Sequence, residues 1–194
     1  TRVILRAERI ILNFITHLSG IANVVAQYAK QLEGTGVQLL DTRKTLPGLR
    51  YPEKYAVLIG GGHNHRKNLT ELLMLKDNHV DAAGGIVAAV EQLRACYGSQ
   101  IPIEVECRTI QEVQLAASCG VLRIMLDNMS AAEMDASLAL IPATIEVEIS
   151  GGVTLETIGA LAQVGTVRKA NFISVGRLTH SAPSADFSLI TTLQ

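Results

Sequence analysis

The feature that most constrains the fold is a pattern repeated through the second half of the chain. A short apolar segment ends in a polar residue, a turn follows, and then a segment with helical spacing begins. Segments 101–106, 121–126, 144–149 and 171–175 follow this pattern, segment 71–75 fits it less clearly, and 37–41 is a further short apolar run. Such segments are the size of single strands. We therefore expect six strands that alternate with helices.

The expected helices carry local start and stop signals. Thr109-x-x-Glu112 and Ser130-x-x-Glu133 are capping boxes, Gly120 ends the first of these helices, and Thr154 is placed to cap another. Strands that alternate with helices form right-handed βαβ units with parallel strands. Six strands are too few for a complete eight-stranded barrel, and the pattern alone leaves an open doubly wound sheet as an alternative.

The region upstream of the first expected strand shows helical spacing in place of the strand pattern. Apolar residues recur at helical spacing over 8–32, and Ser19-Gly20 predicts a break between two helices there.

Composition excludes several classes of protein. There is no Trp and only seven Phe or Tyr, so aliphatic residues must fill the core, as in α/β proteins whose strands are buried on both faces. The net charge of −1 argues against nucleic-acid binding by overall positive field. No apolar run is judged long enough for a membrane span. The three cysteines form no CxxC pair, which indicates a reducing, cytoplasmic setting.

Positive charge is concentrated in one stretch. Residues 43–76 hold seven Lys or Arg against two Glu, in a chain that is otherwise slightly acidic. Most such residues in proteins lie on a solvated surface, but four of these follow strand ends or glycine turns: Arg43, Lys44, Arg66 and Lys76. Because Arg binds carboxylate or phosphate through a rigid two-pronged fork, we expect a small ligand with several negative charges.

A glycine triplet, Gly60-Gly61-Gly62, precedes His63-Asn64-His65-Arg66. A tight turn and a ligand-binding loop are both compatible with three glycines, and the following His and Arg favour the loop. His63 and His65 lack a nearby acidic or Cys residue that would complete a zinc site.

Two carboxylates end successive strands of the repeat, Glu106 and Asp127. They are expected to be neighbours, and facing a basic pocket they would hold Mg²⁺ and sugar hydroxyls. The alternatives are that Asp127 caps a turn and that Glu106 pairs with a core Arg. Glu104 shares the strand face of Glu106 one layer deeper and is the competing candidate.

Ser150-Gly151-Gly152 and Gly176 follow two consecutive strands. Glycine turns at strand ends with exposed backbone N–H groups are typical of phosphate sites in barrels.

Taken together, these motifs resemble the quinolinate phosphoribosyltransferase family. The resemblance spans essentially the whole chain and rests on the combination of DTRKTLPGLR (41–50), GGGHNHR (60–66), KDNH (76–79), EVE (104–106), MLDN (125–128), EISGG (148–152) and SVGRLTHS (174–181). It implies an α/β fold, an incomplete (β/α) TIM-like barrel preceded by helices. Residues 1–36 would be a helical remnant of the family's N-terminal domain and a dimer contact, and 37–194 the barrel domain.

The implied reaction joins quinolinate to phosphoribosyl pyrophosphate and gives nicotinate mononucleotide, pyrophosphate and CO₂, with Mg²⁺ as cofactor. By resemblance, Arg43, His65 and Arg66 would hold the two carboxylates of quinolinate, and Lys44 and Lys76 would lie near the ring and the pyrophosphate. Glu106 and Asp127 would face the ribose and the metal, and Ser150, Gly151, Gly152 and Gly176 would hold the 5′-phosphate. Arg9 would reach the partner subunit's site in a homodimer or higher homo-oligomer.

The chain departs from the family in two respects. The N-terminal α/β domain is absent or nearly so, which makes a non-catalytic fragment one alternative. The turn 165–171 is longer than usual and is expected near the phosphate turn. A second alternative is the paralogous family of molybdenum-transport operons, against which the intact TRKT, NHR and KDNH motifs argue. An aldolase-like barrel enzyme is less favoured because neither Lys has the isolated apolar setting of a Schiff-base lysine.

Overall fold

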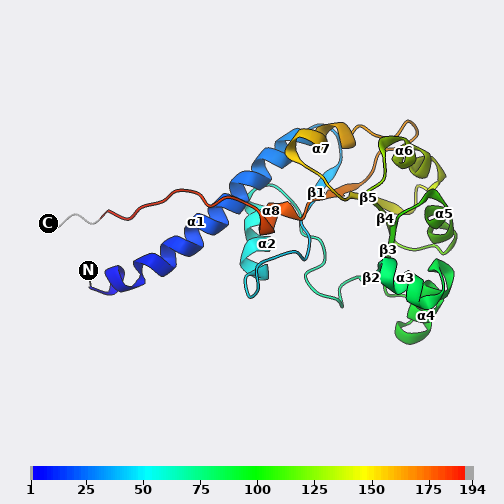
Figure 1. Cartoon of the computed structure of the whole chain (residues 1–194), viewed down its shortest axis with the longest axis horizontal. Coiled ribbons are helices and arrows are strands. Elements are labelled where there is room, and N and C mark those ends of the chain that lie inside the picture. The colour runs from blue at the N-terminus through cyan, green and yellow to red at the C-terminus, as the bar shows by residue number, and fades with distance from the viewer. Residues whose placement is uncertain (1, 191–194) are drawn as a thin grey trace.

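The computed structural model describes residues 2–190 and places six parallel strands in one curved sheet (Figure 1). The strands are β1 (Gln38–Leu40), β2 (Leu73–Leu75), β3 (Ile103–Cys107), β4 (Arg123–Asp127), β5 (Glu146–Ser150) and β6 (Phe172–Ser174). Their order is β1-β6-β5-β4-β3-β2, so β1 and β2 are the two edges. An isolated bridge pairs Leu40 with His63 beside β1. The expected incomplete α/β barrel is thereby confirmed, with its six strands.

Helices cover the outside of this sheet and extend from it at one side (Figure 1). They are α1 (Arg2–Gln31), α2 (Arg50–Ile59), α3 (Asp77–Ala83), α4 (Ile86–Tyr97), α5 (Ile110–Ser118), α6 (Ala131–Leu140), α7 (Leu155–Leu161) and α8 (Arg177–His180).

The predicted helix starts are found in the structure. The Thr109 hydroxyl accepts a hydrogen bond from the Glu112 N–H at 3.2 Å, and α5 ends just before Gly120, which has a φ of 61°. Ser130 and Glu133 form the full reciprocal box at the start of α6. These contacts satisfy N–H groups that a helix leaves without partners in its first turn. Each cap therefore sets where its helix begins. Thr109 does so just after β3, and Ser130 does so just after β4.

One continuous aliphatic core lies between the sheet and the helices. Val105, Ile124, Val147 and Ile173 on the central strands are fully buried, and the outer helices contribute residues such as Val113. Strands buried on both faces need such β-branched side chains, which explains the scarcity of aromatic residues in this chain.

The expected break at Ser19-Gly20 is wrong, because α1 is a single helix of 30 residues. A Cβ added at Gly20 would lie 2.0 Å from the Pro183 carbonyl oxygen, and Ala185 N–H donates to the Thr16 carbonyl at 2.9 Å. The glycine therefore permits the C-terminal segment to pass against the helix, as Figure 1 shows for the red trace beside α1. A single Gly lowers helix stability by about 1 kcal/mol relative to Ala, which tertiary packing outweighs here.

The expectation that no segment reaches the length of a membrane span is also wrong. Within α1, Arg6–Gln31 is long and apolar enough to cross a membrane by length and composition, and it lies near the N-terminus. Its second half instead packs into the barrel core, since Ile21 and Val25 are fully buried and Tyr28 nearly so. The first half of the same stretch stays exposed, as Ile10 and Ile11 show, and 22% of the apolar window is buried.

The predicted division of the chain into residues 1–36 and 37–194 remains a prediction. Residues 1 and 191–194, at the outer limits of these two parts, lie outside the described residues.

The turn 165–171 lies elsewhere than expected. It precedes β6 and is held by Thr166 N–H donating to Asp135 Oδ1 at 2.6 Å, whereas Gly176 follows β6. Because a turn before a strand and a turn after it lie at opposite ends, 165–171 is distant from the predicted phosphate turn.

Candidate functional site

A pocket opens at the carboxyl ends of the strands, where parallel α/β folds place their ligands. Eight of the predicted site residues line it: Arg43, Lys44, His65, Arg66, Lys76, Glu106, Asp127 and Ser150. A second hollow continues from the first and is lined by Gly151, Gly152 and Gly176, with Thr42, Lys44, Ser150 and Ser174 shared between the two. The site therefore has a cationic half and a glycine half.

Arg43 and Arg66 dominate the cationic half. Arg43 Nε is buried and has no hydrogen-bond partner among residues 2–190, while Arg66 donates one hydrogen bond to the Leu72 carbonyl at 2.8 Å. Burial and the nearby positive charge of Arg43 lower the pKa of Arg66. Two like charges held close together, one with an unsatisfied buried donor, are an arrangement that an anion would stabilise.

Two carboxylates near the ends of β3 and β4, Glu106 and Asp127, line the same pocket as these cations. Lys76, the N-cap residue of α3, places Nζ 2.5 Å from Glu106 Oε2. Asp127 accepts a hydrogen bond from Asn128 Nδ2 at 2.8 Å. In the β3–β4 register Glu106 pairs with Met125 and Cys107 with Leu126, so Glu106 and Asp127 are two positions apart on adjacent strands. The predicted neighbourhood of the two carboxylates is therefore present.

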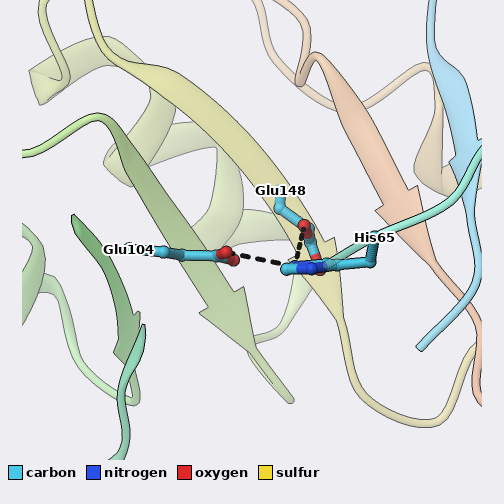
Figure 2. A group of neighbouring side chains, drawn as sticks. All are labelled: His65, Glu104 and Glu148. Carbon is cyan, nitrogen blue, oxygen red and sulfur yellow. Dashed lines mark ion pairs between the residues drawn. The ribbon is translucent and has the colours of Figure 1, made fainter. Parts of the chain in front are cut away.

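At the inner wall of the pocket, His65 lies between two fully buried carboxylates, Glu104 of β3 and Glu148 of β5, and His65 and Glu148 both line the pocket (Figure 2). His65 Nε2 is 3.1 Å from Glu104 Oε2 and 3.3 Å from Glu148 Oε2. Glu104 thus faces the interior and Glu106 the pocket, which resolves the choice between them. Burial, and then the charge of Glu148, raise the pKa of Glu104, because two carboxylates this close resist ionising together.

The other ring nitrogen of His65 decides what this cluster can hold. Arg66 N–H donates to His65 Nδ1 at 2.7 Å, so the lone pair is on Nδ1 and the ring proton is on Nε2, facing the carboxylates. Burial lowers the pKa of His65 and the two carboxylates raise it by more, but a second proton on Nδ1 would oppose the Arg66 N–H. The three side chains have the spacing of a metal site, but a protonated Nε2 has no lone pair for a metal.

The glycine half is built from the turns after β5 and β6. Gly151 and Gly152 have φ values of 94° and 60°, which side chains rarely permit. Ser150 and Ser174 at the ends of β5 and β6 are joined through their hydroxyls at 3.1 Å. A Cβ at Gly176 would come within 3.0 Å of Lys44 Cδ, so the absence of a side chain there lets Lys44 lie across the hollow.

Some predicted residues lie outside the pocket. Arg9 is exposed on α1 and does not line it. The glycine triplet contributes packing between α1 and α2, because a Cβ at Gly60 would meet Ala22 O and Val25 Cβ, each at 2.6 Å. The ligand-loop interpretation therefore holds for His65 and Arg66 and is wrong for Gly60–Gly62. His63 does not line the pocket but a separate hollow, which shares His65 and Arg66 with it and is otherwise lined largely by residues at the amino ends of the strands, such as Gln38 and Phe172.

The sequence analysis missed His180, which lines the glycine half beside Gly176. Its Nδ1 is 2.6 Å from the Ser181 hydroxyl. His180 lies in the motif SVGRLTHS (174–181), which was used for the family resemblance, but the resemblance assigned it no role.

A six-stranded incomplete barrel with a pocket of basic, acidic and glycine residues at the carboxyl ends of its strands places the chain among α/β-barrel proteins. Comparison with known families narrows this class. The family model "Quinolinate phosphoribosyl transferase, C-terminal domain" matches residues 21–190, and the chain belongs to this family.

Individual relatives agree with this assignment. The chain is 43% identical to a probable nicotinate-nucleotide pyrophosphorylase [carboxylating] of Bacillus subtilis, over 98% of this chain and 64% of that protein. It is 42% identical to a mitochondrial quinolinate phosphoribosyltransferase [decarboxylating] of Nicotiana tabacum, over 94% of this chain and 56% of that protein. The crystal structure of NadC from Streptococcus pyogenes superposes with a TM-score of 0.89 at 43% identity, covering 97% of this chain and 65% of that one. The chain therefore spans less than two thirds of the length of these relatives.

Proposed function

We propose that this chain is the barrel portion of a quinolinate phosphoribosyltransferase, which converts quinolinate and phosphoribosyl pyrophosphate to nicotinate mononucleotide, pyrophosphate and CO₂ in NAD biosynthesis. The observation that carries the proposal is the pair Arg43 and Arg66, held together at the pocket with Arg43 Nε buried and unpaired in the described chain. Quinolinate has two adjacent carboxylates, and two guanidinium groups match that geometry. The names of the relatives support the same substrate.

The reaction assigns chemistry to the other half of the pocket. The ring nitrogen of quinolinate forms a bond to the anomeric carbon while the bond from that carbon to pyrophosphate breaks, so positive charge develops on the ribose. The carboxylates of Glu106 and Asp127 would stabilise this charge, and Lys44 and Lys76 would receive the departing pyrophosphate. The bond from C2 to the carboxylate then breaks, its electron pair stays on C2 beside the cationic nitrogen, and C2 takes a proton.

The role of His65 in this proposal differs from direct carboxylate binding. Both of its ring nitrogens face protein groups, and only 7% of the residue is exposed. His65 would therefore orient Arg66, whose N–H it accepts, while Arg43 and Arg66 contact quinolinate.

Glu106 and Asp127 also fit Mg²⁺. Both end in the pocket, and oxygen ligands with remaining water positions suit this ion. Glu106 uses Oε2 for Lys76, which leaves Oε1 for the metal or a metal-bound water. When bound, Mg²⁺ would neutralise the pyrophosphate oxygens.

A homodimer or larger homo-oligomer is part of the proposal. The N-terminal half of α1 exposes a row of large apolar side chains: Ile10, Ile11, Phe14 and Ile15. Exposed apolar surface of this kind is typical of protein contacts. Arg9 is exposed on the same segment and does not line this chain's own pocket, so in an oligomer it would serve a partner's.

A reducing, cytoplasmic setting is supported by three cysteines that form no disulfide.

Isothermal titration with quinolinate in the presence of Mg²⁺, with nicotinate as the control ligand, tests the proposal. We expect quinolinate to bind and nicotinate, which has one carboxylate, to bind at least about tenfold more weakly. The variant R66M should lose this discrimination, whereas R108M, which removes a surface Arg paired with Asp81 and Glu112, should not. Binding only by a version extended at its N-terminus would identify this chain as an incomplete fragment. Failure of both versions would reject quinolinate and favour the paralogous family.

A further inference from the structure

Helix α2 carries a charged side chain in the interior that is not among the residues lining the pocket. Lys54 is 1% exposed, and its partner Asp41, directly after β1, is 0% exposed. Lys54 Nζ donates to Asp41 Oδ1 at 2.5 Å and to the His65 carbonyl at 2.9 Å. Neither charge lies at the surface, where most Lys and Asp residues are found.

The ion pair also holds the neighbouring loop on both sides. Asp41 Oδ1 accepts from the His65 N–H at 2.8 Å, and Asp41 Oδ2 accepts from Asn64 Nδ2 at 2.8 Å. Asn64 Nδ2 in turn donates to the Lys54 carbonyl at 2.9 Å. The backbone N–H and C=O of His65 are therefore both bound to the pair formed by Asp41 and Lys54.

The place of these contacts in the chain connects them to the pocket. Arg43 is two residues after Asp41, and Arg66 is the residue after His65. The ion pair between Asp41 and Lys54 thus links the two segments that carry the guanidinium groups of the pocket, one just before Arg43 and the other just before Arg66. Because Arg43 and Arg66 repel one another, the segments need such a restraint before an anion arrives.

Stability alone is a weak reason for this pair. Burial raises the pKa of Asp41 and lowers that of Lys54, and in each case this effect is larger than that of the partner's charge. Buried ion pairs replaced by apolar groups of similar size often leave stability unchanged or higher. The contacts therefore point to geometry as the contribution of the pair.

We propose that Asp41 and Lys54 are positioning residues, which fix the separation of Arg43 and Arg66 and thereby the affinity of the cationic half for two adjacent carboxylates. This inference rests on the proposed function for the identity of the ligand. It predicts that the pair affects quinolinate much more than a ligand of the glycine half, because that half shares Thr42 and Lys44 with the cationic half but takes the rest of its lining from the ends of β5 and β6 and the turns after them.

The test uses the double variant D41N/K54M, because removing one charge would leave the other buried and unpaired. Quinolinate and ribose 5-phosphate are titrated separately into the wild type and the variant. We expect the Kd for quinolinate to rise at least about tenfold and that for ribose 5-phosphate to change less than about twofold. K169M is the control, because Lys169 Nζ, like that of Lys54, makes two hydrogen bonds, here to the backbone carbonyls of Gln163 and Gly165 outside the pocket. It should leave both affinities unchanged.

Hydrogen exchange supplies a readout that needs no ligand. The amide of His65 should exchange at least about tenfold faster in D41N/K54M, while the amides of Ile124 and Leu126 in β4 keep their protection. Unchanged exchange at His65, or equal losses for both ligands, would overturn the inference. If the wild type does not bind quinolinate but the exchange result holds, the proposed substrate fails and the positioning role stands. If the double variant does not fold, N64A loosens the same loop and should show the same selective acceleration at His65.

Discussion

Gly151 should be the position where a single methyl group does most damage to the glycine half of the pocket. An added Cβ would lie 2.3 Å from Asn128 Oδ1, 2.5 Å from its Cγ and 2.7 Å from its backbone N. The side-chain amide has room to rotate only by giving up its hydrogen bond to Asp127, and the backbone N is held by the Ser150 carbonyl at 3.0 Å. The substitution G151A therefore moves either the glycine turn or the end of β4.

The magnitude has two parts. Backbone in the left-handed region is unfavourable for Ala by about 1–2 kcal/mol relative to Gly, which would lower Tm by about 2–8 °C in a chain of this size. The clash adds a displacement of the turn, and we expect the Kd for ribose 5-phosphate to rise at least about tenfold, equivalent to about 1.4 kcal/mol.

G120A is the matched control. Gly120 has a φ of 61°, is outside the pocket, and would place a Cβ with nothing within 4 Å. Thermal unfolding and isothermal titration with ribose 5-phosphate should show both variants losing stability and only G151A losing affinity. A folded G151A that binds ribose 5-phosphate as tightly as G120A does would refute the reasoning.

Three further predictions concern the metal, the thiols and the core. E106Q should remove most of the gain in pyrophosphate affinity that Mg²⁺ provides, measured by titration with and without the ion; an unchanged gain would exclude Glu106 as a ligand. Ellman's reagent should modify the exposed Cys96 in the native protein and reach Cys107 only after unfolding, because burial raises the pKa of the Cys107 thiol and excludes the reagent. L126A removes a fully buried side chain from β4 and should lower the free energy of unfolding by about 2–5 kcal/mol in urea titration. A loss below about 1 kcal/mol would mean that the core around Leu126 collapses into the space.

Local signals in the sequence were enough to find the frame of the pocket. Thr109 and Ser130 mark helix starts, so the ends of β3 and β4 and the placement of Glu106 and Asp127 followed from residues within a few positions of each other. Parallel pairing then brings consecutive strand ends together without further information.

Features that depend on distant contacts were not predictable in the same way. Gly20 resembled a helix break because its reason, the passage of Pro183, is more than 160 residues away. The triplet beginning at Gly60 resembled a ligand loop because its neighbours Ala22 and Val25 belong to α1. Lys54 was one of seven basic residues in a stretch, and only its contact with Asp41 distinguishes it from the others. The composition of a segment does not reveal which partner a side chain meets.

The two halves of the pocket have separate supports, and this has a consequence for how substitutions combine. The cationic half depends on α2 through Lys54, and the glycine half depends on β5 and β6 through Ser150 and Ser174. Changes at sites without shared partners usually add in free energy, so a substitution in each half should give the sum of its separate effects on a ligand that spans both. Four residues line both halves, Thr42, Lys44, Ser150 and Ser174, and the backbone carbonyl of Lys44 also accepts a hydrogen bond from the Thr179 hydroxyl after β6. Non-additive behaviour is therefore expected for combinations that include one of these four shared residues, because a change at such a residue alters the lining of both halves.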